Sequence, residues 1–374
     1  MTATAEATST LALTVNRSAI LDCVSAVKLV ARSRFKPVLE CVRMTTDGGT
    51  LHLDCTDLAT SLRRSTSQVQ IDGHGVCCVS ANDLHQWLSV IDDDTVDMAV
   101  EGDWLRLKSG AGMRKIYTVD ANDFPPIPTA LDKPTMTVTL PLDAMRAAHE
   151  FVGHAVPQKA DRYAVNGVLI QPGKKQVTLV ATDGRRLAVL GVEAAVEGKQ
   201  SAIVPRDFFS FALRAMPEDS EAEMSISISD NSVLFQSGDA IATSVLIEGS
   251  FPPWDDVIPK DSDILVAVDR ESFRDALRRA QCTQTDESKG CRFKITKGGV
   301  AISSQNAKRG EAEVNYPCKV EGRDLEIGGN PDFFIAALEG MVGDEVKIEC
   351  TSANRPFKLT CGPMTEVIMP VNLQ

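Results

Sequence analysis

The sequence predicts an α+β fold made of three copies of one domain, because landmarks recur along its 374 residues with a period of about 125. Each copy opens with an apolar strand that leads into an amphipathic helix; these segments begin at Leu11, Met136 and Ile264. Each copy also contains a second helix. Each of these second helices has an aspartate in its first turn. The three aspartates, Asp83, Asp207 and Asp332, are separated by 124 and 125 residues.

The elements within a copy follow one order. The opening strand and helix are LALTVNRSAILDCVSAVKLV in the first copy, and alternating strands with a tight turn come next, as in KQVTLVATDGRRLAVLGV. The second helices are VSANDLHQWLSVI, VPRDFFSFALRAM and GNPDFFIAALEGM, where an early aspartate suits the positive end of the helix dipole. Copies one and two end in similar aromatic-proline exits at Phe124 and Phe251, which lie 127 residues apart.

Short charged, proline-containing stretches, ALDKPT and PKDSD, separate the copies and are typical of linkers. We therefore expect a disordered tail over residues 1–10 and three domains, each with two helices and antiparallel sheets, over residues 11–131, 136–259 and 264–374.

The composition narrows the class of protein. No apolar run is long enough to span a membrane, and the first ten residues lack the features of a signal peptide, so we expect a soluble cytoplasmic protein. The ten cysteines are scattered without any C-x-x-C pair, and the histidines lack ligand spacing, which predicts reduced thiols, no metal and no cofactor. Motifs of common enzyme classes, such as G-x-S-x-G and the P-loop, are absent from the sequence, which favours a non-catalytic protein.

Positive charge collects on the first helix of each copy although the net charge is −12. In the third copy, Arg274 and Arg278 lie four residues apart and therefore share one helix face. In the middle copy, the histidines His149 and His154 lie near the basic residues and are counted with them as sources of positive charge. A solvated helix surface is the alternative for any one helix. Recurrence favours a basic lining that contacts phosphates without reading bases.

Geometry then sets the number of domains around a duplex. If each domain presents two helices of about 10 Å, three domains give a bore near 20 Å, too narrow for duplex DNA roughly 20 Å across. Six domains give nearly twice that bore. A ring around DNA would therefore be a head-to-tail homodimer of this chain.

The three-domain plan, VATDGRRLAV, the exit FPPWDDVIP and the C-terminal VIMPVNL together resemble the bacterial sliding clamp family, the beta subunit of DNA polymerase III. The resemblance covers the chain from about Leu11 to Leu373. It implies a non-catalytic ring-shaped homodimer that a clamp loader places around duplex DNA, independently of sequence. It also implies that the polymerase alpha subunit and other proteins with a clamp-binding motif dock in a peptide pocket.

The resemblance also assigns residues. By its own chemistry Asp183-Gly184 predicts a two-residue type I′ hairpin, and in the family this turn lines the rim of the pocket. The expected pocket residues are Thr182, Gly184, Arg185, Arg186, Leu187, Pro252, Val257, Asn330, Phe333, Val367, Ile368, Met369 and Pro370. The expected DNA-binding residues are Arg34, Lys159, Arg162, Tyr163 and Arg206.

Departures from the family pattern bear on which peptide is preferred. Asp256 stands where an arginine is common, Phe333 stands where a tyrosine is common, and an aromatic at the pocket edge near Ser288 is missing. Val371-Asn372 replaces a more usual Met-Arg. A second interpretation keeps the fold and changes the role, to a duplicated or phage- or plasmid-borne clamp that serves as a spare or drug-resistant copy.

Overall fold

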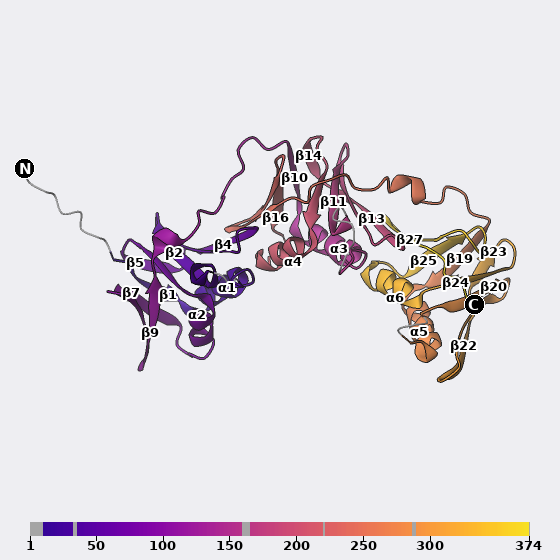
Figure 1. The fold of residues 1–374 in the computed structure, drawn as a ribbon, viewed down its shortest axis with the longest axis horizontal. Helices are drawn as coiled ribbons and strands as arrows, with labels where there is room; N and C mark the ends of the chain where they lie inside the picture. The colour runs from indigo at the N-terminus through magenta and orange to yellow at the C-terminus, as the bar shows by residue number, and fades with distance from the viewer. Residues whose placement is uncertain (1–9, 33–35, 159–164, 220, 286–288, 374) are drawn as a thin grey trace, which may run out of the picture. The chain divides into compact units, whose positions relative to one another are not determined.

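The computed structural model describes residues 10–32, 36–158, 165–219, 221–285 and 289–373, and their elements are labelled in Figure 1. The chain forms two compact units. Unit 1 combines the chain up to Leu142 with Asp207–Leu246, and unit 2 combines Asp143–Arg206 with the chain from Ile247 onward. The middle copy of the repeat therefore contributes to both units, while the expected boundaries at residues 131–136 and 259–264 remain predictions.

Unit 1 contains one long antiparallel sheet, in the order β10-β16-β17-β18-β4-β3-β2-β6-β9-β8-β7-β1-β5. Its strands are β1 (Ala12–Asn16), β2 (Cys41–Asp47), β3 (Thr50–Thr56), β4 (Thr60–Thr66), β5 (Val69–Gly73), β6 (Val76–Ser80), β7 (Thr95–Glu101), β8 (Trp104–Ser109), β9 (Gly112–Val119), β10 (Met136–Pro141), β16 (Glu223–Ile228), β17 (Ser232–Ser237) and β18 (Ala240–Val245). Its helices are α1 (Arg17–Val27), α2 (Ala81–Leu88) and α4 (Arg206–Ala215), whose first residue belongs to unit 2.

Unit 2 contains a nine-stranded sheet in the order β15-β11-β12-β13-β27-β26-β25-β19-β23 and a four-stranded sheet in the order β22-β21-β20-β24. Its strands are β11 (Gly167–Pro172), β12 (Gln176–Thr182), β13 (Arg186–Glu193), β14 (Ala195–Gly198), β15 (Ala202–Pro205), β19 (Ile264–Asp269), β20 (Cys291–Thr296), β21 (Gly299–Asn306), β22 (Gly310–Tyr316), β23 (Lys319–Glu321), β24 (Leu325–Gly329), β25 (Glu345–Cys350), β26 (Phe357–Cys361) and β27 (Met364–Ile368). Its helices are α3 (Leu142–Gly153), α5 (Arg270–Ala280) and α6 (Pro331–Gly340).

The strand-to-helix junctions form where the sequence predicts them. Asn16 caps α1 and Asp269 caps α5, each accepting a hydrogen bond from a backbone N–H of the first turn, of Ala19 and Ser272 respectively. Because the capping side chain satisfies a donor that the helix leaves unpaired, it fixes the residue at which strand gives way to helix. The predicted strand–helix opening of each copy is confirmed as β1–α1, β10–α3 and β19–α5.

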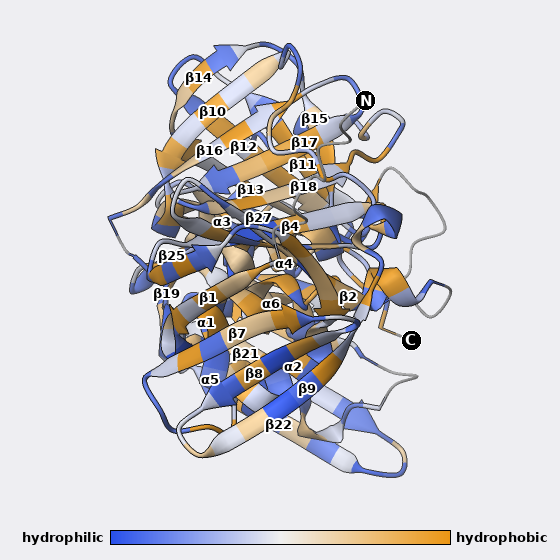
Figure 2. Cartoon of the chain, turned by 90° about the vertical axis from the view of Figure 1, so that its left-hand side faces the viewer, coloured by the Kyte–Doolittle hydropathy of each residue, from blue (hydrophilic) through white to orange (hydrophobic). Residues whose placement is uncertain are grey.

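The second helix of each copy is also confirmed, as α2, α4 and α6, with Asp83, Asp207 and Asp332 in the first turns. The sequence of α6 is mostly apolar, as its hydrophobic colouring in Figure 2 shows. Its Phe334 is buried and lies against two other rings, Phe293 and Phe357, at centroid distances of 5.0 and 4.9 Å. Such aromatic clusters combine large apolar burial with favourable edge contacts, which anchors α6 on the sheets of unit 2.

In the described part of the chain, no helix combines the length and the hydrophobicity that a membrane crossing requires.

Candidate peptide-binding pocket and nucleic-acid interface

The Thr182–Leu187 turn differs from the predicted type I′ hairpin. Thr182 pairs with Leu187 across β12 and β13, so four residues lie between these paired residues, and the last of them, Arg186, already belongs to β13. Of the two residues Asp183 and Gly184, only Gly184 has a positive φ, of 82°, whereas type I′ needs positive φ at both central residues. The two-residue prediction is therefore wrong.

The Asp183 carboxylate explains the observed turn. Its Oδ1 accepts hydrogen bonds from the backbone N–H groups of Arg185 and Arg186, at 2.9 and 3.0 Å. The Thr182 hydroxyl donates to the Arg186 carbonyl oxygen at 2.6 Å and accepts from the Gly184 N–H. A side chain that bonds to its own backbone in this way favours a longer, more rigid turn over the tight one.

A hollow of about 930 Å³ lies beside this turn, entirely within unit 2. Ten of the thirteen expected pocket residues line it: Thr182, Gly184, Arg185, Arg186, Leu187, Pro252, Val257, Phe333, Val367 and Met369. They come from the turn, the Pro252–Val257 exit, α6 and the end of β27. The structure thus brings together segments that are up to about 190 residues apart in the sequence.

One wall of the hollow is the surface of an apolar cluster. Leu187 and Val367 belong to this cluster and are almost fully buried, and Trp254 packs against it. Trp254 also donates its indole N–H to the Gln171 side-chain oxygen at 3.1 Å, which fixes the ring. Met369, by contrast, is 43% exposed. A fixed apolar wall beside an exposed, flexible methionine suits a site that binds apolar side chains of a peptide.

Arg186 organises the polar side of the hollow. Its Nε donates to the Asp183 Oδ2 at 3.1 Å, and its guanidinium lies 4.6 Å from the centre of the Phe333 ring. It also donates to the backbone carbonyl oxygen of His154, just past the end of α3. Arg186 therefore connects the turn, α3 and α6, and we expect it to act mainly in positioning rather than as a free cation.

A second hollow, of about 1020 Å³, adjoins the first and shares Arg185, Phe333 and Met369 with it. Asn330 and Pro370 line this second hollow only. Asn330 also caps α6 by accepting from the Asp332 N–H, so it has a structural role as well. Lys289 and Gly290 also line this second hollow, close in sequence to the position where the family pattern has an aromatic residue that this chain lacks.

Ile368 is the one expected pocket residue that lines neither hollow. It is fully buried, because side chains alternate along β27 and its neighbours Val367 and Met369 face the pocket. Sequence reasoning also missed lining residues, namely His154, Val156, Pro157, Gln158, Val165, Asp183, Pro253 and Trp254. Trp254 could have been assigned to the pocket from the sequence, because it directly follows Pro252-Pro253. The lining residues after α3 carry no such sequence signal, because only tertiary packing places them beside the turn.

Of the expected DNA-binding residues only Arg206 lies among the described residues, and its role in DNA binding stays a prediction. Arg34, Lys159, Arg162 and Tyr163 lie outside the described residues. Arg206 begins α4, is partly exposed and lines the first hollow.

His149 and His154, which the sequence placed near the basic residues of the middle copy, are not cationic. Burial and the nearby Arg206 lower the pKa of His149 to about 4, and burial and Arg186 lower the pKa of His154 to about 3. Both rings are neutral at physiological pH, so the expectation that they add positive charge is wrong.

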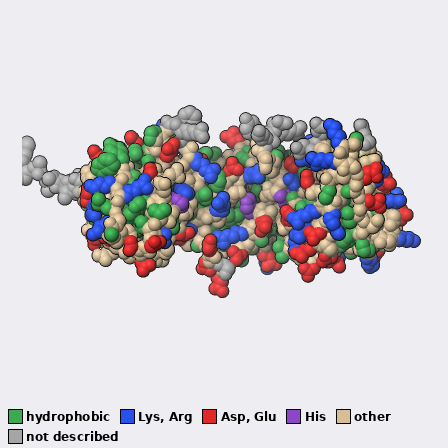
Figure 3. Space-filling model, turned by 90° about the horizontal axis from the view of Figure 1, so that it is seen from below, with side chains coloured by type: hydrophobic (Ala, Val, Ile, Leu, Met, Phe, Trp, Pro, Cys, Tyr) green, Lys and Arg blue, Asp and Glu red, His purple; other side chains and the backbone are tan. Residues whose placement is uncertain are grey.

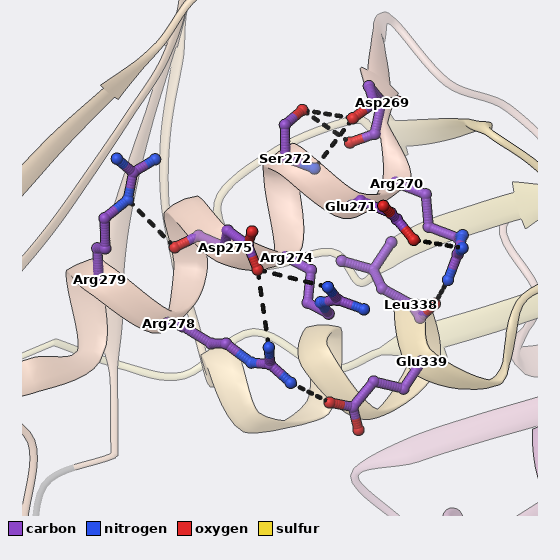
Figure 4. Close-up of polar contacts among 10 residues, drawn as sticks. All are labelled: Asp269, Arg270, Glu271, Ser272, Arg274, Asp275, Arg278, Arg279, Leu338 and Glu339. Atoms are coloured by element: carbon purple, nitrogen blue, oxygen red, sulfur yellow. Dashed lines mark hydrogen bonds and ion pairs between the residues drawn. The ribbon is translucent and has the colours of Figure 1, made fainter.

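Helix α5 carries the expected row of arginines, but carboxylates accompany it (Figure 4). Arg278 contacts Glu339 of α6 at 2.6 Å and Asp275 at 3.7 Å, and Arg274 lies 3.5 Å from Asp275. The molecular face in Figure 3 likewise shows basic and acidic side chains interspersed. Contacts of such a surface with phosphates would be few and sensitive to salt, because each arginine would have to give up a carboxylate contact to bind a phosphate.

Comparison with known proteins identifies the family. Three successive domain models of the DNA polymerase III beta subunit match the chain, the N-terminal domain at residues 11–128, the central domain at 139–253 and the C-terminal domain at 255–372. The matches follow one another in the order of the family.

Individual relatives agree along the whole length. A beta sliding clamp from Pseudomonas putida is 29% identical, covering 96% of this chain and 99% of that protein, and one from Escherichia coli K12 is 26% identical over 90% and 93%. The crystal structure of a DNA polymerase sliding clamp from Pseudomonas aeruginosa superposes with a TM-score of 0.90 at 26% identity, covering 97% of this chain and all of that one. The chain belongs to the family of DNA polymerase III beta subunits, the bacterial sliding clamps.

Proposed function

We propose that this sliding clamp encircles duplex DNA as a head-to-tail homodimer and tethers the alpha subunit of DNA polymerase III through the pocket beside the Thr182–Leu187 turn. A clamp loader would place it on DNA, and other proteins with the same short motif would compete for the pocket. Sliding clamps are non-catalytic processivity factors, so binding and linkage supply the whole function. No observation on the described residues favours the alternative of a spare or drug-resistant copy.

The observation that carries the tethering role is the pocket itself. It combines an apolar wall at Leu187 and Val367, a polar rim at the turn and an exposed methionine, Met369. An extended peptide needs apolar anchor sites flanked by groups that can bond to its backbone. The pocket offers both within one unit, and it needs no rearrangement between parts of the chain.

Two open strand edges support the homodimer. Strand β22 ends the four-stranded sheet of unit 2, and in unit 1 β9 pairs with β6 only at its last two residues, Thr118 and Val119. The edge of β22 carries the exposed acids Glu311 and Glu313, whereas β9 carries Lys115 beside the exposed Met113 and Tyr117. Figure 2 shows hydrophilic residues along both strands.

An open edge is a site for pairing with another chain. Opposite charges on the two edges favour β9 of one protomer against β22 of the other, and disfavour each edge pairing with its own copy. Because the two edges are different surfaces, this contact is head-to-tail, and a pair of such contacts closes a symmetric dimer.

Met369→Ala tests the pocket. Since Met369 is 43% exposed, its truncation removes a peptide contact at little cost to folding. We expect the affinity for a fluorescently labelled polymerase tail peptide to fall by about 1–2 kcal/mol, measured by fluorescence polarisation. Leu187→Ala would weaken binding too, but Leu187 is only 3% exposed, so that variant also loses core stability.

The matched control is Val342→Ala, which truncates another exposed apolar residue of unit 2 that lines neither hollow. Its peptide affinity should equal that of the wild type. Equal affinity of Met369→Ala and the wild type would remove the pocket assignment.

A further inference from the structure

A buried pair of ionisable side chains lies beneath the wall of the peptide pocket. His154, just past the end of α3, places its Nε2 3.5 Å from the Glu366 Oε2, and Glu366 is fully buried in β27. Strand alternation turns Glu366 away from the pocket face that its neighbour Val367 lines. The pair therefore joins the end of α3 to the strand that carries the pocket wall.

Within the described part of the chain, these groups have only each other. Neither nitrogen of the His154 ring and neither oxygen of the Glu366 carboxyl forms a hydrogen bond with a described residue, and the 3.5 Å approach of Nε2 to Oε2 is the polar contact recorded between the two side chains. Across the sheet, Glu366 lies opposite Ala188 on β13 and Leu359 on β26, which offer no polar side chain. Leaving a buried polar atom unpaired is costly, and a proton between the His154 Nε2 and the Glu366 Oε2 would pair one atom of each group.

Other charged groups near the pair have partners of their own. Arg186 of β13 and Asp183 of the turn both act electrostatically on Glu366, and they form an ion pair with each other. On α3, His149 is itself neutral. Farther out, Glu339 of α6 contacts Arg278 and Lys358 of β26 contacts Glu349.

The pair is connected to the pocket through Arg186. This guanidinium donates to the His154 backbone oxygen and lies over Phe333, which lines both hollows. A shift of His154 would therefore move Arg186, and with it the polar side of the pocket.

We propose that His154 and Glu366 share a single proton throughout the neutral pH range, and that this protonated pair positions the pocket wall for peptide binding. Glu366 is a positioning residue, because it does not line the pocket and acts on it through His154, which lines the hollow, and through Arg186. The proposal deepens the peptide-binding function described above and rests on it.

The direction of each pKa shift agrees with one bound proton. Burial raises the pKa of the Glu366 carboxyl well above its usual value, and burial with Arg186 lowers the pKa of His154 to about 3. Near neutral pH the folded pair thus keeps one proton, carried by the Glu366 carboxyl beside a neutral His154 ring. The unfolded chain keeps one proton only between the ordinary pKa values of glutamate and histidine, about 4.5 and 6.5.

The pH dependence follows from this difference. Between pH 4.5 and 6.5 folded and unfolded states hold equal numbers of protons, so the pair contributes no pH dependence to folding. Above pH 6.5 the unfolded chain releases its proton and the folded pair retains it. The folding equilibrium constant then falls by up to tenfold per pH unit, until the folded pair releases its proton as well.

Glu366→Gln isolates this effect, because the amide imitates a protonated carboxyl and cannot titrate. We expect the ratio of folding constants, variant over wild type, to rise by close to tenfold per pH unit from about pH 5 to pH 8, measured by urea unfolding of the full chain. Other titrating groups cancel in this ratio. A ratio that stays constant over this range would mean that Glu366 is ionised in the folded protein, and would overturn the proposal.

Peptide affinity tests the positioning role. At pH 7 Glu366→Gln should bind the labelled polymerase peptide within about threefold of the wild type, whereas Glu366→Ala, which leaves His154 unpaired, should bind roughly tenfold more weakly. Unchanged affinity in Glu366→Ala would refute the positioning role. If Glu366→Ala does not fold, the Gln variant still decides on the shared proton. A wild-type protein that fails to bind the peptide at all would refute the pocket instead.

Discussion

At the scale of single residues, Asp183 holds both the turn at the pocket rim and the guanidinium of Arg186. One carboxylate holds the backbone N–H groups of Arg185 and Arg186 and the guanidinium of Arg186. These contacts fix the turn that forms the pocket rim and the cation that lies over Phe333. Removing the carboxylate therefore affects folding and peptide binding together.

Asp183→Ala should lower the free energy of unfolding by about 2 kcal/mol, because two backbone donors and one guanidinium lose a charged acceptor. Asp183→Asn keeps an oxygen for the backbone donors and should cost about 1 kcal/mol or less. Urea unfolding measures both. Equal losses in the two variants would show that the charge on Arg186, rather than the turn, is what Asp183 stabilises.

Sequence reasoning succeeded at residues whose local chemistry is decisive and failed where burial decides. The first-turn aspartates and the clustering of Thr182, Leu187 and Met369 were predictable, because capping chemistry and family motifs are local signals. The neutral state of His154 was not, since tertiary packing desolvates the ring and places it beside Glu366, about 210 residues away in the sequence. Ile368 was assigned to the pocket because its motif is contiguous, whereas its strand alternates between two faces.

At the scale of elements, the repeat predicts strands and helices well and turns poorly. The six helices named here begin close to their expected positions, since apolar periodicity and caps agree. The Asp-Gly hairpin was assigned the shorter loop because the sequence pattern does not reveal that the Asp183 side chain bonds to its own backbone. Edge strands were not predictable either, because strand order is a property of the folded sheet.

The pairing of β9 with β22 of a partner makes a prediction at this scale. Glu313→Lys places a positive charge on the acidic edge and should repel Lys115 and Arg114 on the partner's β9. We expect sedimentation or light scattering to give a mass near 40.4 kDa for the variant and about twice that for the wild type.

Glu197→Lys is the matched control, since it reverses an exposed acid on β14, away from both edges. It should remain dimeric. A Glu313→Lys protein that is as dimeric as the control would contradict the proposed pairing of these strands.

At the scale of the whole molecule, the repeat predicts three domains and the contacts form two compact units. The middle copy divides because β18 pairs with β4 of the first copy, while β13 pairs with β27 of the third. Similarity between the repeats shows which segments form equivalent elements. It does not show which copies join into one β-sheet, because that depends on hydrogen bonds between strands of different repeats.

The central claim is that the clamp holds DNA by encircling it, and a circular template tests this most directly. Protein loaded by the clamp loader onto nicked circular plasmid should stay bound through gel filtration at high salt, because linkage does not depend on ion pairs. Cutting the same plasmid once with a restriction enzyme should release the protein from the DNA ends. Retention on the linear product, or loss from the intact circle at high salt, would contradict the account.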